Sequence, residues 1–136
     1  MREPYTQNYM HLVWATWDRL PLLTGEIKDA IYACIQQECS RLKADVIAIG
    51  GIEDHIHLLV RFPMTVAMAD LLKQVKGVSS HMVTHKLGYK EGFKWQGAYG
   101  AFTYSKADVP RVRAYILNQE QHHRNGTTLP DMEFSE

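Results

Sequence analysis

The secondary structure that the sequence predicts, β-α-β-β-α-β with one further helix after the last strand, places the chain in the α+β class. Two patterns give this order. Apolar residues alternate with polar ones in short segments, as in strands, and recur at helical spacing in the segments between them. The 136 residues contain no repeat, low-complexity tract or linker, so we expect one domain over residues 1–136, long enough to bury a core.

Turn signals separate the predicted elements. Thr24 and Thr65 are expected to open the first two helices, and residues 18–21, 53–54 and 88–92 to form turns or loops. In order, we expect a strand over 5–17, a helix over 24–42, strands over 46–52 and 55–62, a helix over 65–82, a strand over 99–104 and a helix over 108–124. This is the order of the ferredoxin-like, or RRM-like, arrangement, an antiparallel sheet with two helices on one face. The added helix could then lie over the other face.

The strand over 55–62 contains two histidines, His55 and His57, that alternate with apolar residues. Successive side chains of a strand point to opposite faces, so both histidines emerge on one face while Ile56 and Leu58 point into the core. Two imidazoles at this separation can bind one divalent metal ion. A pair of surface histidines without a ligand is the alternative.

The helix over 108–124 brings two more polar side chains onto one face. Asp108 is expected to cap it and residues 125–126, Asn-Gly, to end it. Tyr115 and Gln119 are four residues apart, hence one turn apart on the same face. A phenol, an amide oxygen and two imidazoles could therefore converge on one metal and one phosphate. Taken alone, Tyr115 is better explained as a core tyrosine and Gln119 as a solvated residue.

The net charge of zero does not favour nucleic-acid binding, but the distribution of the charges along the chain is compatible with it. Residues 71–94 carry five lysines and one acid, whereas residues 1–70 carry six basic and nine acidic side chains. The basic segment and the aromatic residues after it suit phosphate contacts and base stacking, for which Lys94 and Trp95 are candidates. A solvated helix face is the alternative.

Several protein classes are not expected from this composition. The chain lacks a continuous apolar run of about 18 residues, which a membrane span needs, and its first four residues lack the apolar stretch of a signal peptide. Cys34 and Cys39 do not have CxxC spacing and are expected to be reduced thiols. We therefore predict a cytoplasmic protein without membrane contact.

The pattern His55-Ile56-His57, together with residues 115–119, resembles the active-site motifs of a known family. This family is the single-tyrosine HUH transposases of small bacterial insertion sequences, in the superfamily of the REP-associated tyrosine transposases. Four further segments resemble the family as well, over residues 9–17, 71–80, 93–102 and 119–123. The resemblance covers roughly residues 5–125, in the order of the family.

The resemblance implies a DNA transposase that cleaves and rejoins single-stranded DNA at insertion-sequence ends. Tyr115 would attack the scissile phosphate to give a 5′-phosphotyrosine and a free 3′-OH, and a second 3′-OH would reverse the attack without ATP. A divalent metal held by His55, His57 and Gln119 would neutralise and orient the phosphate. This mixed nitrogen and oxygen set suits Mn²⁺ better than Mg²⁺, and the family uses either.

Two more residues have possible supporting roles. Asp54 could orient one histidine by contacting the ring on the side away from the metal, or be a solvated turn residue. His122, seven residues after Tyr115, is a candidate for proton transfer or phosphate contact, and stabilisation of the helix dipole is the alternative.

The resemblance also implies partners. The family recognises hairpins in single-stranded element ends through the helices that flank the sheet. Its members form homodimers, in some of which the tyrosine helix of one subunit completes the site of the other. The residues this brings near DNA are Lys73, Lys76, Ser79 and Ser80. The acidic tail over 130–136 looks short for the family, which leaves a truncated or decayed copy as one interpretation.

Three alternatives to this transposase remain. The first is a domesticated relative that acts on chromosomal repeat hairpins. The second is a non-catalytic ferredoxin-like nucleic-acid-binding module, whose DNA affinity would be indifferent to metal and to Tyr115→Phe. The third is a small metal-binding or sensory domain without DNA affinity. The presence of His55, His57, Tyr115 and Gln119 together favours the enzyme over the last two.

Overall fold

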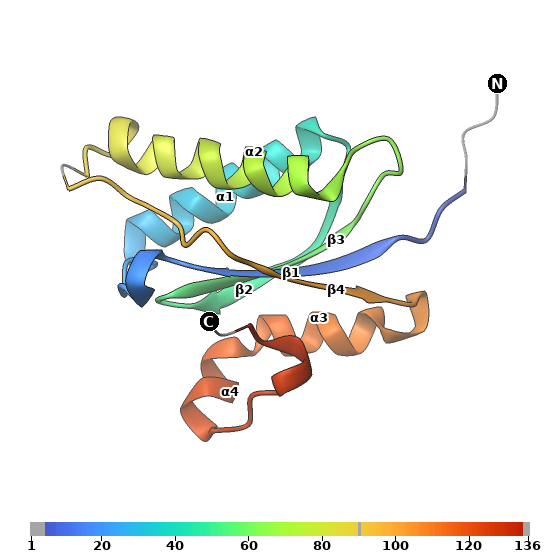
Figure 1. The fold of residues 1–136 in the computed structure, drawn as a ribbon. Coiled ribbons are helices and arrows are strands. Elements are labelled where there is room, and N and C mark those ends of the chain that lie inside the picture. The colour runs from blue at the N-terminus through green and yellow to red at the C-terminus, as the bar shows by residue number, and fades with distance from the viewer. Residues whose placement is uncertain (1–4, 90, 135–136) are drawn as a thin grey trace.

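Four strands form one antiparallel sheet in the computed structural model, which describes residues 5–89 and 91–134 (Figure 1). They are β1 (Tyr9–Ala15), β2 (Asp45–Ile52), β3 (His55–Arg61) and β4 (Gly100–Tyr104), in the spatial order β2-β3-β1-β4. Strand β1 pairs antiparallel with β3 and β4, and β3 pairs antiparallel with β2. This topology confirms the ferredoxin-like architecture predicted from the sequence.

Helices cover both faces of the sheet (Figure 1). On one face lie α1 (Gly25–Arg41) and α2 (Met68–His81), and α2 continues into a π-helical turn over Met82–Lys86. On the other face lie α3 (Val109–Leu117) and α4 (Gln119–Asn125). The core between the sheet and the first two helices includes the fully buried residues Leu12, Trp14, Ile31, Ile35, Ile56, Leu58, Val60, Leu71 and Val75.

Alternation along β1 and β3 separates an apolar face from a polar one. Leu12 and Ile56 belong to the core beneath α1 and α2, whereas on the other face His57 contacts both His11 and His55. All five side chains are buried. The same two strands therefore contribute both to the main core and to a cluster of histidines.

The helix predicted over 108–124 is in fact two helices. Asn118 has φ −109° and ψ 25°, outside the helical region, and separates α3 from α4. Its side-chain amide donates a hydrogen bond of 2.8 Å to the Ala114 carbonyl oxygen, and such side-chain competition for the backbone favours a break. Tyr115 and Gln119, predicted to lie one turn apart on one helix, therefore belong to different helices.

The predicted first strand, 5–17, is also too long. It ends at Ala15, and Trp17 begins a 3₁₀ turn over Trp17–Arg19 with half of its side chain exposed. Asp18 and Arg19 have positive φ values of 55° and 53°, which a strand does not accommodate. Residues 1–4, residue 90 of the predicted loop and residues 135–136 of the predicted acidic tail lie outside the described residues.

Gly50 of β2 allows α3 to lie directly on the sheet. A Cβ atom at this position would be 2.3 Å from the carbonyl oxygen of Ile116, so any larger residue would push the helix away. The contact closes a second, smaller core formed by Ala48, Leu59, Val112, Tyr115, Ile116 and Met132. Within the described part of the chain, no helix combines the length and the apolar character needed to span a membrane.

Candidate active site

The Nε2 atoms of His55 and His57 face Glu133, a residue of the C-terminal segment. Glu133 Oε1 lies 3.2 Å from His57 Nε2 and 3.5 Å from His55 Nε2. One donor atom from each of the three residues lies within 4.8 Å of the others. Imidazole nitrogens and a carboxylate oxygen are donors for divalent metals, so this group could hold a metal ion.

Gln119 adds an amide oxygen to the same group. Its Oε1 lies 3.3 Å from His55 Nε2, and its Nε2 donates to Glu133 Oε2 at 3.4 Å. The side chain is almost fully buried. The break at Asn118 therefore leaves Gln119 facing the histidines, at the start of α4 instead of within a longer helix.

The Tyr115 hydroxyl has two hydrogen-bond partners. It donates to Glu133 Oε2 and accepts from the Leu129 backbone N–H at 3.0 Å. Burial raises the pKa of Tyr115 and the hydrogen bond to Glu133 raises it further, so the phenol is protonated in this arrangement. For Glu133, burial favours a higher pKa. Hydrogen bonds from His55, His57 and Tyr115 outweigh it and hold this pKa well below its usual range.

Both histidines are also held through their other ring nitrogen. His55 Nδ1 lies 2.8 Å from Asp54 Oδ1, and His57 Nδ1 lies 2.8 Å from Nε2 of His11. Burial lowers the pKa of His57. Burial acts in the same direction on His55, but hydrogen bonds to Glu133 and Asp54 outweigh it and raise the pKa of His55 overall. Asp54 thus contacts a histidine, as expected for a residue that orients it.

The two histidines of α4 occupy different places. The His122 ring packs against the Tyr115 ring at a centroid distance of 4.7 Å, and its Nδ1 lies 2.9 Å from Thr127 Oγ1. His123 Nε2 lies 3.1 Å from Gln119 Oε1 and 3.7 Å from Glu133 Oε1. His123, and not the sequence candidate His122, is therefore the one that contacts Gln119 and Glu133.

A comparison with protein families matches most of this chain. The family model for IS200-like transposases matches residues 4–119, which include β1 to β4 and the site residues as far as Gln119. The chain belongs to the IS200-like transposase family. This confirms the resemblance seen in the sequence. Glu133 and His123 lie beyond the matched residues.

Individual relatives agree with this assignment. The ISDra2 transposase of Deinococcus radiodurans is 28% identical over 114 residues, which cover 80% of this chain and 81% of the relative. The IS200 transposase of Salmonella typhimurium is 24% identical over 124 residues, covering 88% and 81%.

Two solved structures share the fold. One is a Deinococcus radiodurans R1 protein described as a transposase, with a TM-score of 0.66, 24% identity and coverage of 88% of this chain and 98% of that one. The other is a REP-associated tyrosine transposase bound to a REP hairpin, with a TM-score of 0.66, 15% identity and coverage of 94% and 74%.

Three site residues of this transposase were not found from its sequence. His11 had a signal, a polar residue inside an otherwise apolar strand, and His123 follows Gln119 by one helical turn. Glu133 had no such signal. It reaches the site through the turn at Gly126, where φ is 65°, and through the buried Met132. The acidic tail was interpreted by its shortness for the family, and none of its residues was assigned to the site.

The residues predicted to contact DNA do not form one surface. Lys73 and Lys94 are exposed, whereas Ser79 and Trp95 are buried and joined by a hydrogen bond of 3.0 Å from Trp95 Nε1 to Ser79 Oγ. Trp95 packs edge-on against Trp14 in the main core. In this structure neither Ser79 nor Trp95 can reach DNA, and the expectation for these two residues is corrected.

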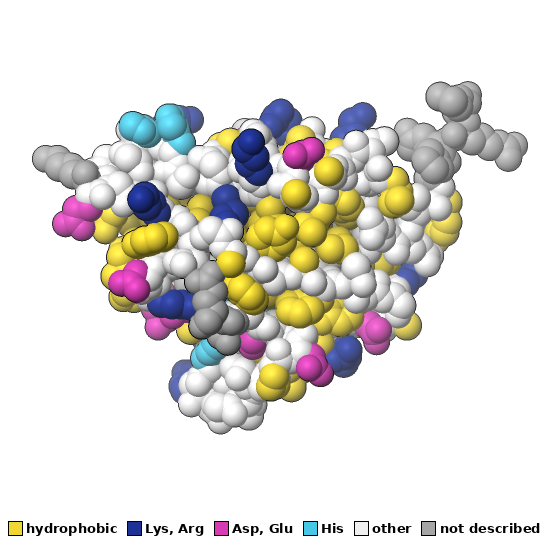
Figure 2. All heavy atoms as spheres, in the orientation of Figure 1, with side chains coloured by type: hydrophobic (Ala, Val, Ile, Leu, Met, Phe, Trp, Pro, Cys, Tyr) yellow, Lys and Arg dark blue, Asp and Glu magenta, His cyan; other side chains and the backbone are white. Residues whose placement is uncertain are grey.

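The remaining candidates lie along α2. Lys76 Nζ donates to the Gln96 carbonyl oxygen at 2.7 Å, and Ser80 Oγ donates to the Gly77 carbonyl oxygen at 3.1 Å. Figure 2 shows Lys and Arg side chains, in dark blue, spread along α2 at the top of the view, with histidines at its C-terminal end. The basic character predicted for this segment is therefore displayed on the surface.

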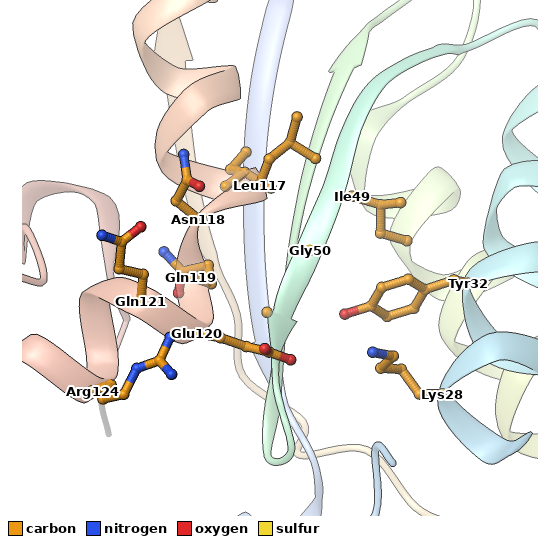
Figure 3. A pocket seen from close by; sticks show the side chains of 12 residues that line it. Lys28, Tyr32, Ile49, Gly50, Leu117, Asn118, Gln119, Glu120, Gln121 and Arg124 are labelled. Carbon is orange, nitrogen blue, oxygen red and sulfur yellow. The ribbon is translucent and has the colours of Figure 1, made fainter. Parts of the chain in front are cut away.

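Two pockets adjoin the site. One of about 390 Å³ opens beside the edge strand β2, where Lys28 and Tyr32 of α1 face Glu120 of α4, and Gln119 also lines it (Figure 3). The other, about 630 Å³, is lined in part by Trp17, Arg19 and Phe134. Arg19 connects it to the site, because its guanidinium lies 3.7 Å from Asp54 Oδ1.

Proposed function

We propose that this transposase cleaves and rejoins single-stranded DNA at insertion-sequence ends, with Tyr115 as the nucleophile. The observation that carries the proposal is the position of Glu133. Its Oε2 accepts the hydrogen bond of the Tyr115 hydroxyl, and its Oε1 faces the Nε2 atoms of His55 and His57. The nucleophile and the candidate metal donors thus share one carboxylate.

The raised pKa of Tyr115 keeps its phenol protonated, and a protonated phenol is a weak nucleophile. The covalent step therefore requires the phenol to lose its proton. Glu133 would accept this proton as Tyr115 Oη attacks the phosphorus. The bond from phosphorus to the 3′ oxygen breaks, and that oxygen takes up a proton and leaves as a free 3′-OH. Attack by the 3′-OH of another strand on the 5′-phosphotyrosine would reverse these steps and rejoin the DNA.

His55, His57, Gln119 and Glu133 would hold the divalent metal, Mg²⁺ or Mn²⁺. The donor set fits, because the Nδ1 atoms of both histidines already have partners and both Nε2 atoms face Glu133 Oε1, while His55 Nε2 also faces Gln119 Oε1. A metal bound there would neutralise charge on the scissile phosphate and orient it for attack. Two nitrogens and two oxygens suit Mn²⁺ better than Mg²⁺.

The DNA would be a single strand that carries hairpins. The REP-associated relative of similar fold is bound to a REP hairpin, which supports this substrate class. Lys73 and Lys94 are exposed and would contact phosphates, and Lys94 Nζ lies 5.3 Å from the centre of the half-exposed Trp17 ring. A homodimer, which the family resemblance implies, is part of the proposal and is checked by light scattering.

The test is formation of a covalent protein–DNA adduct. Labelled single strands of the DNA that flanks the gene are incubated with the protein and Mn²⁺ or Mg²⁺, then run on a denaturing protein gel. We expect a labelled protein band with wild type and with Tyr99→Phe, which alters an exposed tyrosine, and none with Tyr115→Phe. An adduct with Tyr115→Phe, or hairpin binding by wild type without any adduct, would overturn the proposal.

A further inference from the structure

His11 lies within β1, fully buried on the histidine-bearing face of the sheet, and contacts His57 directly. Its Nε2 is 2.8 Å from His57 Nδ1, and the two rings stack with a centroid distance of 5.0 Å and an interplanar angle of 28°. Its other nitrogen, Nδ1, is buried and has no hydrogen-bond partner among the described residues. No step of the function proposed above uses this side chain.

The contact between the two rings contains one proton. A nitrogen–nitrogen distance of 2.8 Å is a hydrogen bond, which needs one donor and one bare acceptor. Both rings are fully buried, and an apolar interior disfavours a charged imidazole at either position. Both rings are therefore neutral, and each carries one proton of its own. The tautomer of one ring consequently fixes the tautomer of the other.

Only two arrangements satisfy this condition. In the first, His11 Nε2 donates to His57 Nδ1, and the proton of His57 is on Nε2, which faces Glu133 Oε1 at 3.2 Å. In the second, His57 Nδ1 donates to His11 Nε2, so His57 Nε2 is bare and the proton of His11 is on Nδ1. A metal binds a bare ring nitrogen, so only the second arrangement allows His57 to be a ligand through Nε2.

We propose that His11 is a positioning residue that holds His57 in its metal-binding tautomer by accepting a hydrogen bond from His57 Nδ1. The inference rests on the metal site of the proposed function. On metal binding, one proton leaves His57 Nε2, the bridging proton passes from His11 to His57, and one proton is taken up at His11 Nδ1. Asp54 has the corresponding position behind His55, but as a carboxylate it adds a charge, whereas His11 offers a neutral acceptor.

The tautomers can be read directly by nitrogen-15 NMR of the imidazole rings, without any DNA. In the metal-free protein we expect His11 and His57 to be protonated at Nε2. With saturating Mg²⁺ we expect both to be protonated at Nδ1. A His11 ring that stays protonated at Nε2 when Mg²⁺ is bound would overturn the inference.

Metal affinity gives a second test, by calorimetric titration of Mn²⁺ alone. His11→Phe keeps a ring of similar shape but cannot accept a hydrogen bond, and we expect it to weaken Mn²⁺ binding by about tenfold or more. His11→Gln keeps a hydrogen-bond acceptor at a position close to Nε2. We expect its Mn²⁺ affinity to be within about threefold of wild type, a smaller change than the tenfold or greater loss expected when such a partner is removed. His85→Phe, at an exposed histidine beyond α2, is the matched control and should bind as wild type does.

The outcomes separate this inference from the proposed function. If the wild type binds Mn²⁺ no better than His57→Ala, the metal site itself is wrong. If the wild type binds and His11→Phe binds equally tightly, only the role of His11 is wrong. If His11→Phe does not fold, His11→Gln and the NMR experiment on the wild type still decide the question.

Discussion

The two faces of the sheet are built from alternate residues of the same strands, but they are completed in different ways. Toward α1 and α2, Leu12 and Leu58 are covered by apolar residues of two long helices. Toward α3 and α4, His11 and His57 lie in the same strands and are covered by polar groups, among them Glu133 from the C-terminal segment. Both layers are buried.

The two faces of the sheet place different demands on the residues that cover them. An apolar face needs only shape and volume, so it gains stability from any well-packed neighbour. A buried polar face needs a specific partner for each donor and acceptor, and a missing partner is costly. Substitutions on the first face should therefore change stability, and substitutions on the second should change metal binding and DNA cleavage.

The largest effect is expected from Glu133→Gln on the polar face. The amide keeps the shape of the side chain but cannot take the Tyr115 proton, so the rate of adduct formation should fall by about 10²-fold or more. The midpoint of urea unfolding measures whether the fold is kept. Glu120→Gln, on an exposed residue of α4, is the control. An unchanged rate would show that the carboxylate is not needed.

On the apolar face, Leu58→Ala should lower the free energy of unfolding by about 2–5 kcal/mol, because it leaves a cavity in the main core. Urea titration followed by circular dichroism measures this loss. The folded variant should bind Mn²⁺ as tightly as wild type. Leu117→Ala, at a side chain that is half exposed, should cost much less. A large loss of metal affinity in Leu58→Ala would show that the two faces are coupled.

Acid should destabilise the polar face through His11. Its pKa is about 3 in the folded chain against 6.5 in a model peptide, so between these values the unfolded state binds a proton that the folded state does not. Stability is therefore lost as the pH falls through this range, by about 2 kcal/mol between pH 8 and pH 5. Urea titrations of the metal-free protein at both pH values should show a smaller loss for His11→Gln. An equal loss in both proteins would assign the effect to other groups.

An effect of similar size is expected where α3 meets β2. Gly50→Ala would bring a Cβ atom to 2.3 Å from the Ile116 carbonyl oxygen, so α3 must move, at a cost of about 1–3 kcal/mol. Adduct formation should slow as well, because Tyr115 moves with the helix. Gly77→Ala is the matched control, since its Cβ would have no neighbour within 4 Å, and should not destabilise the fold. Similar results for the two variants would contradict this close approach.

The main elements of the fold could be predicted because their patterns are local. Alternation placed His55 and His57 opposite Ile56 and Leu58, and helical spacing located α1 and α2. The errors lie where one residue overrides its neighbours. Asp18 and Arg19 end β1 through positive φ values, and Asn118 divides the last helix through its own hydrogen bond. A single residue of this kind does not change the periodicity of the segment around it, so the periodicity does not reveal where the element ends.

The candidate site divides in the same way. Alternation in a strand predicted the pair His55 and His57. Spacing placed Tyr115 and Gln119 on one helical face, but their place in the site was predicted only through the family resemblance. Glu133 was not found, because it contacts His57 across 76 residues of sequence and no repeating pattern joins them. Trp95 was misjudged for the opposite reason. An aromatic residue next to lysines is equally typical of a stacking platform and of a core, and only its burial distinguishes them.

The dependence of the site on Glu133 has a genetic consequence. A nonsense mutation that removed residues 126–136 would leave every strand and the helices α1 to α4 encoded. The product would lose the carboxylate that contacts Tyr115 and the backbone N–H of Leu129 that donates to the same hydroxyl. We expect such an allele to give a protein that folds and occupies its DNA without cutting it. In a cell that also makes the intact protein, the truncated protein would compete with it for DNA, so the allele would not behave as a simple loss of function.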